Sequence, residues 1–301
     1  MSGDKALQKQ PELSFALAFA LLVMGAIAMG VSPVFVRFSE VGPFSSAFWR
    51  VLLSLPVLLL WAWLELRRAG RPLKWNMDRT LVLSGLFFAG DLIFWHLAIH
   101  RTTMANATLM ATLAPVWVAL FSGTFIGEPV PRTTWLGLFL CLAGAALLIG
   151  SSYQLAPERI IGDIYGVITS VFFGLYFLAI RVARRNRKSG EVTLLSTIVT
   201  TAVLFVTAII SGQKMLPDTA QGVASLVALG TFSHAGGQGL LAVALGSLSA
   251  AFSSLVIFVE ALAAAFFGWA VFGETLSPQQ FAGAALILTG IWIARPKPSR
   301  S

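Results

Sequence analysis

The chain has 301 residues, of which 57% are hydrophobic and only 11% are charged, and its mean hydropathy is +0.82. Soluble domains carry about a quarter of their residues as charges, so this composition excludes an ordinary soluble enzyme or binding domain. The net charge of +8 is also found in nucleic-acid-binding proteins, but here the placement of the basic residues argues for a different origin, described below.

Ten apolar segments are long enough to cross a hydrocarbon core of about 30 Å as α-helices. In chain order they are 13–36, 44–64, 80–100, 105–126, 133–150, 164–183, 192–211, 219–241, 248–272 and 279–294. Membrane β-barrels are built from short alternating segments, which these long apolar runs do not resemble. The predicted fold class is therefore an all-α membrane protein with ten transmembrane helices.

The basic residues fall mainly in alternate loops. If the N-terminus is inside, the outer loops hold only Arg37, Arg101, Arg159 and Lys214, and the inner loops and tails hold most of the others. This asymmetry predicts an inner (plasma) membrane protein with cytoplasmic tails at 1–12 and 295–301. The net charge is then a topology signal that involves membrane lipids, and we expect no nucleic-acid partner.

The second half of the chain repeats the first. An offset of 146 residues places Gly127-Glu128 on Gly273-Glu274, Gly137 on Gly283 and Gly144 on Gly290. Upstream, an offset of 144 places Gly30 on Gly174 and Arg37 on Arg181. A unit of about 145 residues has therefore been duplicated, and the two repeats are predicted at 13–152 and 153–294.

Each repeat contains five helices, an odd number, so the second copy enters the membrane from the opposite side. The loop charges agree, because the loop after the first helix has only Arg37 whereas its counterpart after the sixth has five basic residues between Arg181 and Lys188. Inverted five-helix repeats place a substrate site near the midplane between halves that can rock. The sequence therefore predicts a secondary transporter that works by alternating access.

The chain resembles the EamA-type members of the drug/metabolite transporter superfamily. The resemblance is carried by the inverted fives, the two Gly-Glu pairs, Phe48-Trp49-Arg50, and a hairpin that runs from Gly90-Asp91 to Ala114-Pro115. It implies a cavity lined by helices 1, 3, 4, 6, 8 and 9, with helices 5 and 10 outside. The small four-helix members use a first-helix glutamate for proton coupling, and this chain has no carboxylate between Glu12 and Glu40.

Ionisable residues inside membrane helices are costly and mark candidate sites. Glu260 lies near the middle of the ninth helix, and Asp91 lies in the third with Trp95 one turn later, so acid and indole could together bind an ammonium group. The full set of candidates for substrate binding or proton coupling is Glu260, Asp91, Trp95, His96, His234, Gln238, Asn106, Tyr176 and Trp117. The alternatives are structural: hydrogen bonding by Glu260, pairing of Asp91 with Arg50 or Asn106, and packing by the aromatic side chains.

A second group of residues is predicted to act in structure or gating. Its members are Arg50, Pro115, Gly127, Glu128, Gly273 and Glu274. Each glycine is expected to end a helix in the left-handed conformation, with the following glutamate near the positive N-terminus of the next helix. Ser277 to Gln280 resembles a capping box that opens the tenth helix.

The function predicted from these features is the export of amino acids or related small metabolites. Proton antiport is the expected coupling if Glu260, Asp91 or a histidine titrates in the cavity. Uptake of a vitamin or nucleoside-like compound is the alternative, and a non-transporting scaffold or channel is a second one. No phosphate-binding loop or catalytic motif is found in the sequence, so we expect no enzyme, no cofactor and no metal. The oligomeric state stays open, and a monomer is compatible with the sequence.

Overall fold

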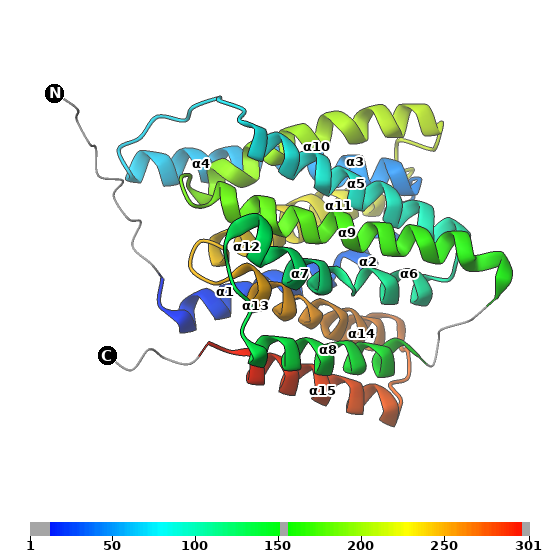
Figure 1. Ribbon diagram of the computed structural model, residues 1–301. Coiled ribbons are helices and arrows are strands. Elements are labelled where there is room, and N and C mark those ends of the chain that lie inside the picture. The colour runs from blue at the N-terminus through cyan, green and yellow to red at the C-terminus, as the bar shows by residue number, and fades with distance from the viewer. Residues whose placement is uncertain (1–12, 151–155, 297–301) are drawn as a thin grey trace.

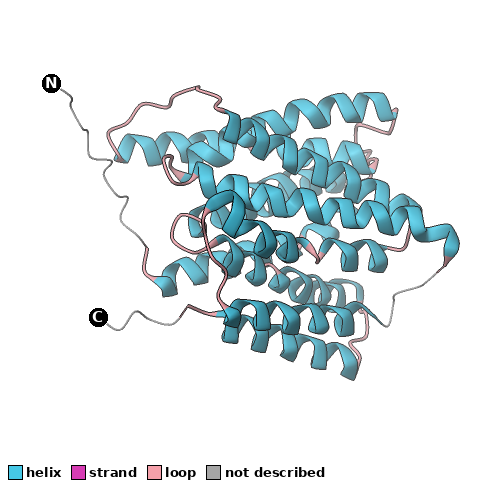
Figure 2. Ribbon diagram, viewed as in Figure 1, coloured by secondary structure: helices cyan, strands magenta, loops and turns pink. Residues whose placement is uncertain are grey.

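Helices joined by short loops make up the computed structural model, which describes residues 13–150 and 156–296 and contains no strand in those ranges (Figure 2). Within them, nine helical stretches are long and apolar enough to cross a membrane. The tenth predicted helix forms as α15 (Pro278–Ala294), which has 17 residues and packs along α8 (Arg132–Gly150). The predicted all-α membrane fold is confirmed. The tail at 1–12, the residues from 297 onwards and the repeat boundary at 152–153 lie outside the described residues.

Several of the spans consist of more than one helical element (Figure 1). The remaining elements of the first half are α1 (Phe15–Gly30), α2 (Ser32–Arg37), α3 (Pro43–Leu52), α4 (Leu55–Arg68), α5 (Arg79–Arg101), α6 (Met104–Ala111) and α7 (Ala114–Ile126). Those of the second half are η1 (Pro157–Arg159), α9 (Ile160–Ala183), α10 (Ser189–Ser211), α11 (Ala220–Ala228), η2 (Leu229–Gln238), α12 (Gly239–Ala244), α13 (Ala250–Val256) and α14 (Phe258–Phe272).

The fourth and ninth spans are broken at equivalent points. In the fourth span, α7 follows α6 after Thr112 and Leu113, and Pro115 lies in its first turn, where the missing N–H costs least. In the ninth span the break is at Ile257, and Glu260 consequently lies in the first turn of α14. Broken helices near mid-span are typical of transporter binding sites. The eighth span is interrupted differently, by the π-helix η2.

The contacts between the two halves are reciprocal, as an inverted repeat requires. Where a span of one half packs on a span of the other, the equivalents of these two spans also pack together. The third span, α5, packs along the sixth, α9, and the eighth, formed by η2 and α12, packs along the first, α1. In the same way α7 packs on α9, and α14 packs on α1. Figure 1 shows that α1 begins on the left whereas α9, its equivalent, begins on the right. The predicted inversion is confirmed by these reciprocal contacts.

Glycines at the contact between α8 and α15 follow the same two-fold relationship. A Cβ atom on Gly137 would lie 2.5 Å from the carbonyl oxygen of Gly290, and one on Gly144 would lie 2.6 Å from that of Gly283. The repeat places Gly137 on Gly283 and Gly144 on Gly290, so each contact is the image of the other. Small residues allow the two helix backbones to approach closely. The resulting van der Waals packing drives helix association in a membrane, where lipid tails are as apolar as the side chains and the hydrophobic effect does not contribute.

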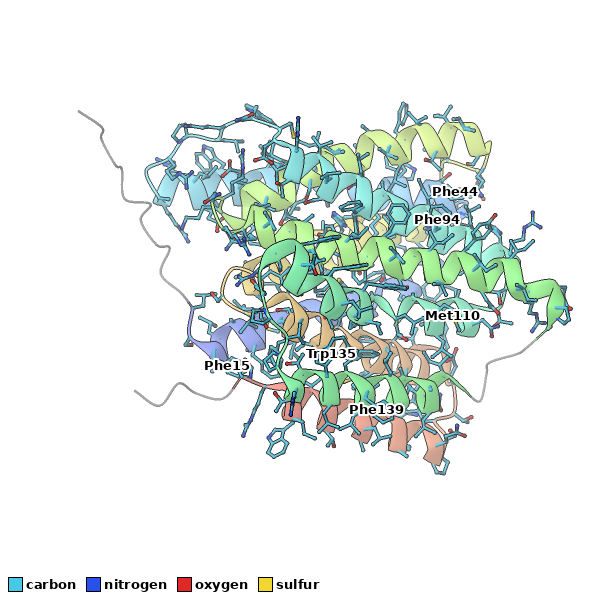
Figure 3. The ribbon with its side chains drawn as sticks, in the orientation of Figure 1. Phe15, Phe44, Phe94, Met110, Trp135 and Phe139 are labelled. Carbon is cyan, nitrogen blue, oxygen red and sulfur yellow. The ribbon has the colours of Figure 1, made fainter. Side chains whose placement is uncertain are left out.

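Apolar side chains cover the outside of the bundle. On α8, for example, Trp135 and Phe139 are both exposed (Figure 3). A large exposed apolar surface is stable in a bilayer but not in water. The chain is a multi-pass membrane protein. Its basic loops follow α4 and α9, whose carboxyl ends share the left side of Figure 1, and we call that side the basic end.

Candidate functional site

A cavity of about 690 Å³ lies between the two halves. Residues of the first, third, fourth, sixth, eighth and ninth spans line it, as the resemblance implies, and the second span contributes as well through α3. Arg37 and Glu274, at the ends of α2 and α14, line the same cavity and are largely exposed. The cavity therefore opens at the end opposite the basic end.

Besides Arg37 and Glu274, three charged side chains line the cavity. Arg50 comes from α3, Asp91 from α5 and Glu260 from the first turn of α14. Arg50 interacts electrostatically with both acids, yet within the described chain no ion pair joins any two of the three. The Nε atom of Arg50 is buried and has no hydrogen-bond partner. The three charged groups therefore share one cavity and interact electrostatically without an ion pair among them.

His96 and Trp95 line the cavity beside these charges. The Nδ1 atom of His96 lies 2.6 Å from the carbonyl oxygen of Leu92, and because a carbonyl only accepts, this nitrogen carries the proton. In a neutral ring, Nε2 is then an acceptor, and it is buried without a partner. The ring of Trp95 meets that of His96 edge-on at 5.0 Å between centroids.

Gln238 also lines the cavity, and its amide group is held on both sides. The hydroxyl of Tyr176 donates to Gln238 Oε1 at 3.1 Å, and Gln238 Nε2 donates to the sulfur of Met29 at 3.2 Å. Tyr176 itself does not line the cavity. It contacts the lining through Gln238 and through the rings of Phe88 and Phe173.

Three further candidates lie away from the cavity lining. His234 Nε2 bonds Thr197 on α10 at 3.0 Å, and Trp117 Nε1 donates to Ser170 on α9 at 2.8 Å. Asn106 Nδ2 donates to the carboxylate of Asp163 at 3.1 Å. These contacts join neighbouring helices, and any role of the three residues in binding stays a prediction.

The two Gly-Glu pairs have the expected backbone. Gly127 and Gly273 end α7 and α14 with positive φ values of 70° and 68°. The side chain of Glu128, however, binds the N-terminus of α13 and not that of α8, the helix that follows it in the chain. Its Oε2 atom accepts from the backbone N–H of Ala250, the first residue of α13, at 3.0 Å, and its Oε1 atom pairs with Arg181 at 2.5 Å. This ion pair between Arg181 and Glu128 was not predicted from the sequence.

Comparison with known proteins identifies the family. The model of the EamA-like transporter family matches the chain twice, over residues 16–150 and 160–295. The chain belongs to the EamA-like transporter family. The resemblance seen in the sequence is thereby confirmed, and so is the prediction of a transporter and not an enzyme.

Relatives of this EamA-like transporter have been named in archaea and bacteria. An uncharacterized transporter of Archaeoglobus fulgidus is 31% identical over 52% of this chain, and the aligned stretch spans only about half, 54%, of that relative. The pseudopaline exporter CntI of Pseudomonas aeruginosa is 26% identical over 74% of each chain. A solved crystal structure matches with a TM-score of 0.81 at 18% identity, covering 93% of this chain and 97% of the other. That likeness shows a shared fold.

Proposed function

We propose that this EamA-like transporter exports a small metabolite carrying both an amine and a carboxylate, such as an amino acid or a related compound, by alternating access. The observation that carries the proposal is the presence of Arg50, Asp91 and Glu260 in one cavity without an ion pair between them. Charges that do not satisfy one another in a cavity at membrane depth are available to a ligand of matching charge.

The chemistry of each group suggests its role. The guanidinium of Arg50 suits a substrate carboxylate, which it can bind through two parallel hydrogen bonds. Asp91 and Glu260 suit a substrate ammonium group, and the indole of Trp95 adds a cation–π surface. His96 Nε2, an acceptor in the neutral ring, offers a further position for a donor. Apolar residues such as Phe173 and Phe258 also line the cavity and provide room for a side chain.

Proton antiport is the coupling that these groups favour. A carboxylate that binds either a proton or a substrate ammonium makes the two ligands mutually exclusive, which is the requirement for exchange. We assign this role first to Glu260, because it lies in the first turn of a half-helix beside the break in the ninth span. In the proposed orientation the basic end faces the cytoplasm, in line with the excess of Arg and Lys there.

Export is preferred over uptake because CntI is named as an exporter, and its alignment with this chain covers 74% of the chain. Comparative metabolomics of cells and medium, with and without the protein, tests this choice. We expect a metabolite with an amine and a carboxylate to move from cells to medium when the protein is present. Accumulation inside the cells would favour the uptake of a vitamin or nucleoside-like compound, and no change would contradict transport.

A further inference from the structure

Arg181 and Glu128 tie together three elements at the basic end. Arg181, near the end of α9, binds Glu128 through Nε at 2.5 Å and the carbonyl oxygen of Leu245 through Nη1 at 2.6 Å. Glu128 in turn accepts from the first N–H of α13, donated by Ala250 at 3.0 Å. A carboxylate bound by both a guanidinium and a helix N-terminus is doubly charge-assisted. Both side chains are mostly buried, at 21% and 18% exposed.

The repeat places a second copy of this pair at the opposite end. Arg37 is the equivalent of Arg181, and Glu274 is the equivalent of Glu128. Here Arg37 Nη1 lies 4.0 Å from Glu274 Oε1, and the two side chains are 64% and 61% exposed. Arg37 instead lies over the ring of Phe272, 4.2 Å from its centroid. The same two residue types therefore form a tight contact at one end and a loose one at the other, where the cavity opens.

The half-helices beside the two Arg–Glu pairs, α13 and α6, also differ in how tightly they are packed. Every residue of α13 is buried, and α13 packs on α7 and α9. Its equivalent is α6, and both helices begin at a hydroxyl N-cap, Ser249 and Thr103. Thr108 and Ala111 of α6 line the open cavity, and in the described chain no comparable packing joins α6 to α14 or α2. The basic end is thus sealed and the opposite end is open.

We propose that the two Arg–Glu pairs are the gates of the transporter and that they close in alternation. This inference rests on the alternating-access mechanism proposed above. In the opposite state, Arg37 binds Glu274 tightly, and Glu274 accepts from the first N–H of α6, which is that of Met104. At the same time Arg181 and Glu128 separate and become hydrated, which limits the energetic cost of parting them.

One difference between the gates sets the preferred state. At the basic end Arg185 lies 4.0 Å from Glu128 and donates to the carbonyl oxygen of Ile126 at 2.5 Å. The equivalent position in the first half is Val41, which has no charge. The closed basic gate therefore has an additional cation that its counterpart lacks. This asymmetry favours the state seen here, open at the end opposite the basic one.

Cysteine accessibility tests the alternation directly. Cys141 is first replaced by serine, and then either Val36→Cys or Ile180→Cys is introduced. These two positions are equivalent in the repeat, but Val36 lines the open cavity whereas Ile180 is fully buried near the closed gate. Sealed vesicles of defined orientation are treated from each side with a membrane-impermeant maleimide. The wild-type gates should give strong labelling of Val36→Cys and weak labelling of Ile180→Cys.

The matched variants Glu128→Gln and Glu274→Gln should shift labelling in opposite directions. Loss of a charge-assisted contact is expected to change the ratio of the two labels by about tenfold. Glu128→Gln should raise labelling of Ile180→Cys and lower that of Val36→Cys, and Glu274→Gln should do the reverse. Arg181→Lys, which keeps the charge, should give an intermediate shift. The amount of monodisperse protein serves as the folding control.

The outcomes separate the gates from the underlying mechanism. Labelling of Ile180→Cys in some fraction of molecules with wild-type gates would support alternating access. If both Glu variants then change the ratio of the two labels in the same direction, or leave it unchanged, the gate assignment is wrong although alternating access stands. If Ile180→Cys stays unlabelled from the basic side in all variants, both the gates and alternating access are contradicted.

Discussion

Gly30, at the end of α1, lies directly against the backbone of Glu260 on α14. A Cβ atom on Gly30 would stand 2.6 Å from the carbonyl oxygen of Glu260 and equally close to the side chain of Ala263. The repeat reproduces this contact in the other half, where a Cβ on Gly174 would stand 3.1 Å from the carbonyl oxygen of Ala114. The candidate binding carboxylate is therefore positioned by a helix contact that only glycine permits.

Gly30→Ala should push α14 away from α1 and displace Glu260. Overpacking of this kind costs about 1–3 kcal/mol, so we expect a lower thermal unfolding temperature and reduced transport. Gly123→Ala is the matched control, because a Cβ at this exposed helical position meets nothing within 4 Å. Equal unfolding temperatures for the two variants would show that the contact between α1 and α14 can relax without cost.

Glu40 gives a pH-dependent contribution to stability at the end opposite the basic one. The hydroxyl of Thr219 donates to its carboxylate at 2.8 Å, and this bond lowers the pKa of Glu40 below its ordinary value of 4.5. A carboxyl group with a depressed folded-state pKa stabilises the protein above its unfolded pKa and loses that effect as the pH falls through the folded value. The carboxylate also accepts the N–H groups of Asp218 and Thr219 at 3.0 Å.

Glu40→Gln should therefore unfold at a lower temperature than the wild type at pH 7, and the difference should vanish at a pH below the folded-state pKa. Thermal unfolding measured across this range checks the sign. Glu158→Gln, which removes an exposed carboxylate, is the control. A difference that persists unchanged into strong acid would mean that the stabilisation does not depend on the charge of Glu40.

The capping box at the start of α15 should be measurable by itself. Ser277 accepts from the backbone N–H of Gln280, and the side chain of Gln280 accepts from the N–H of Ser277. Ser277→Ala should destabilise the protein by about 1 kcal/mol, whereas Ser277→Thr keeps the hydroxyl and should be close to neutral. Both are compared by thermal unfolding in the same detergent.

We expect Arg50 to contribute to transport through its positive charge. Arg50→Met removes the cation that interacts electrostatically with Asp91 and Glu260, and transport should fall by at least about tenfold. Arg50→Lys keeps a cation but loses the planar fork, so partial recovery is expected if the charge acts on the substrate. Identical losses in the two variants, at equal protein levels, would argue for a packing role.

Much of the architecture followed from hydropathy and the repeat. Long apolar runs predict helices whatever their partners, and recurrent glycines such as Gly137 and Gly283 predict close contacts in both halves. The breaks at Val31 and Ile257 and the π-helix η2 were not foreseen, because hydropathy is continuous across them. Which face of a helix borders the cavity depends on packing, so the equally polar His96 and His234 could not be told apart.

The ion pair of Arg181 and Glu128 was also missed, although a signal for it exists. The two residues are far apart in the sequence, and neither one alone indicates a partner. Arg37 and Glu274, however, recur at the equivalent positions of the other half. When both members of an oppositely charged pair are retained in the two copies of a duplicated unit, the pattern predicts that the two side chains contact each other.

Glu260→Gln tests the proposed transport mechanism most directly. Wild-type and Glu260→Gln proteins are reconstituted into proteoliposomes with a pH gradient and the metabolite found by metabolomics, and exchange of that metabolite against protons is measured. We expect the wild type to accumulate the metabolite against its gradient and Glu260→Gln to lose this coupling while remaining folded and monodisperse. Normal proton-coupled exchange by Glu260→Gln would contradict the role proposed for this carboxylate.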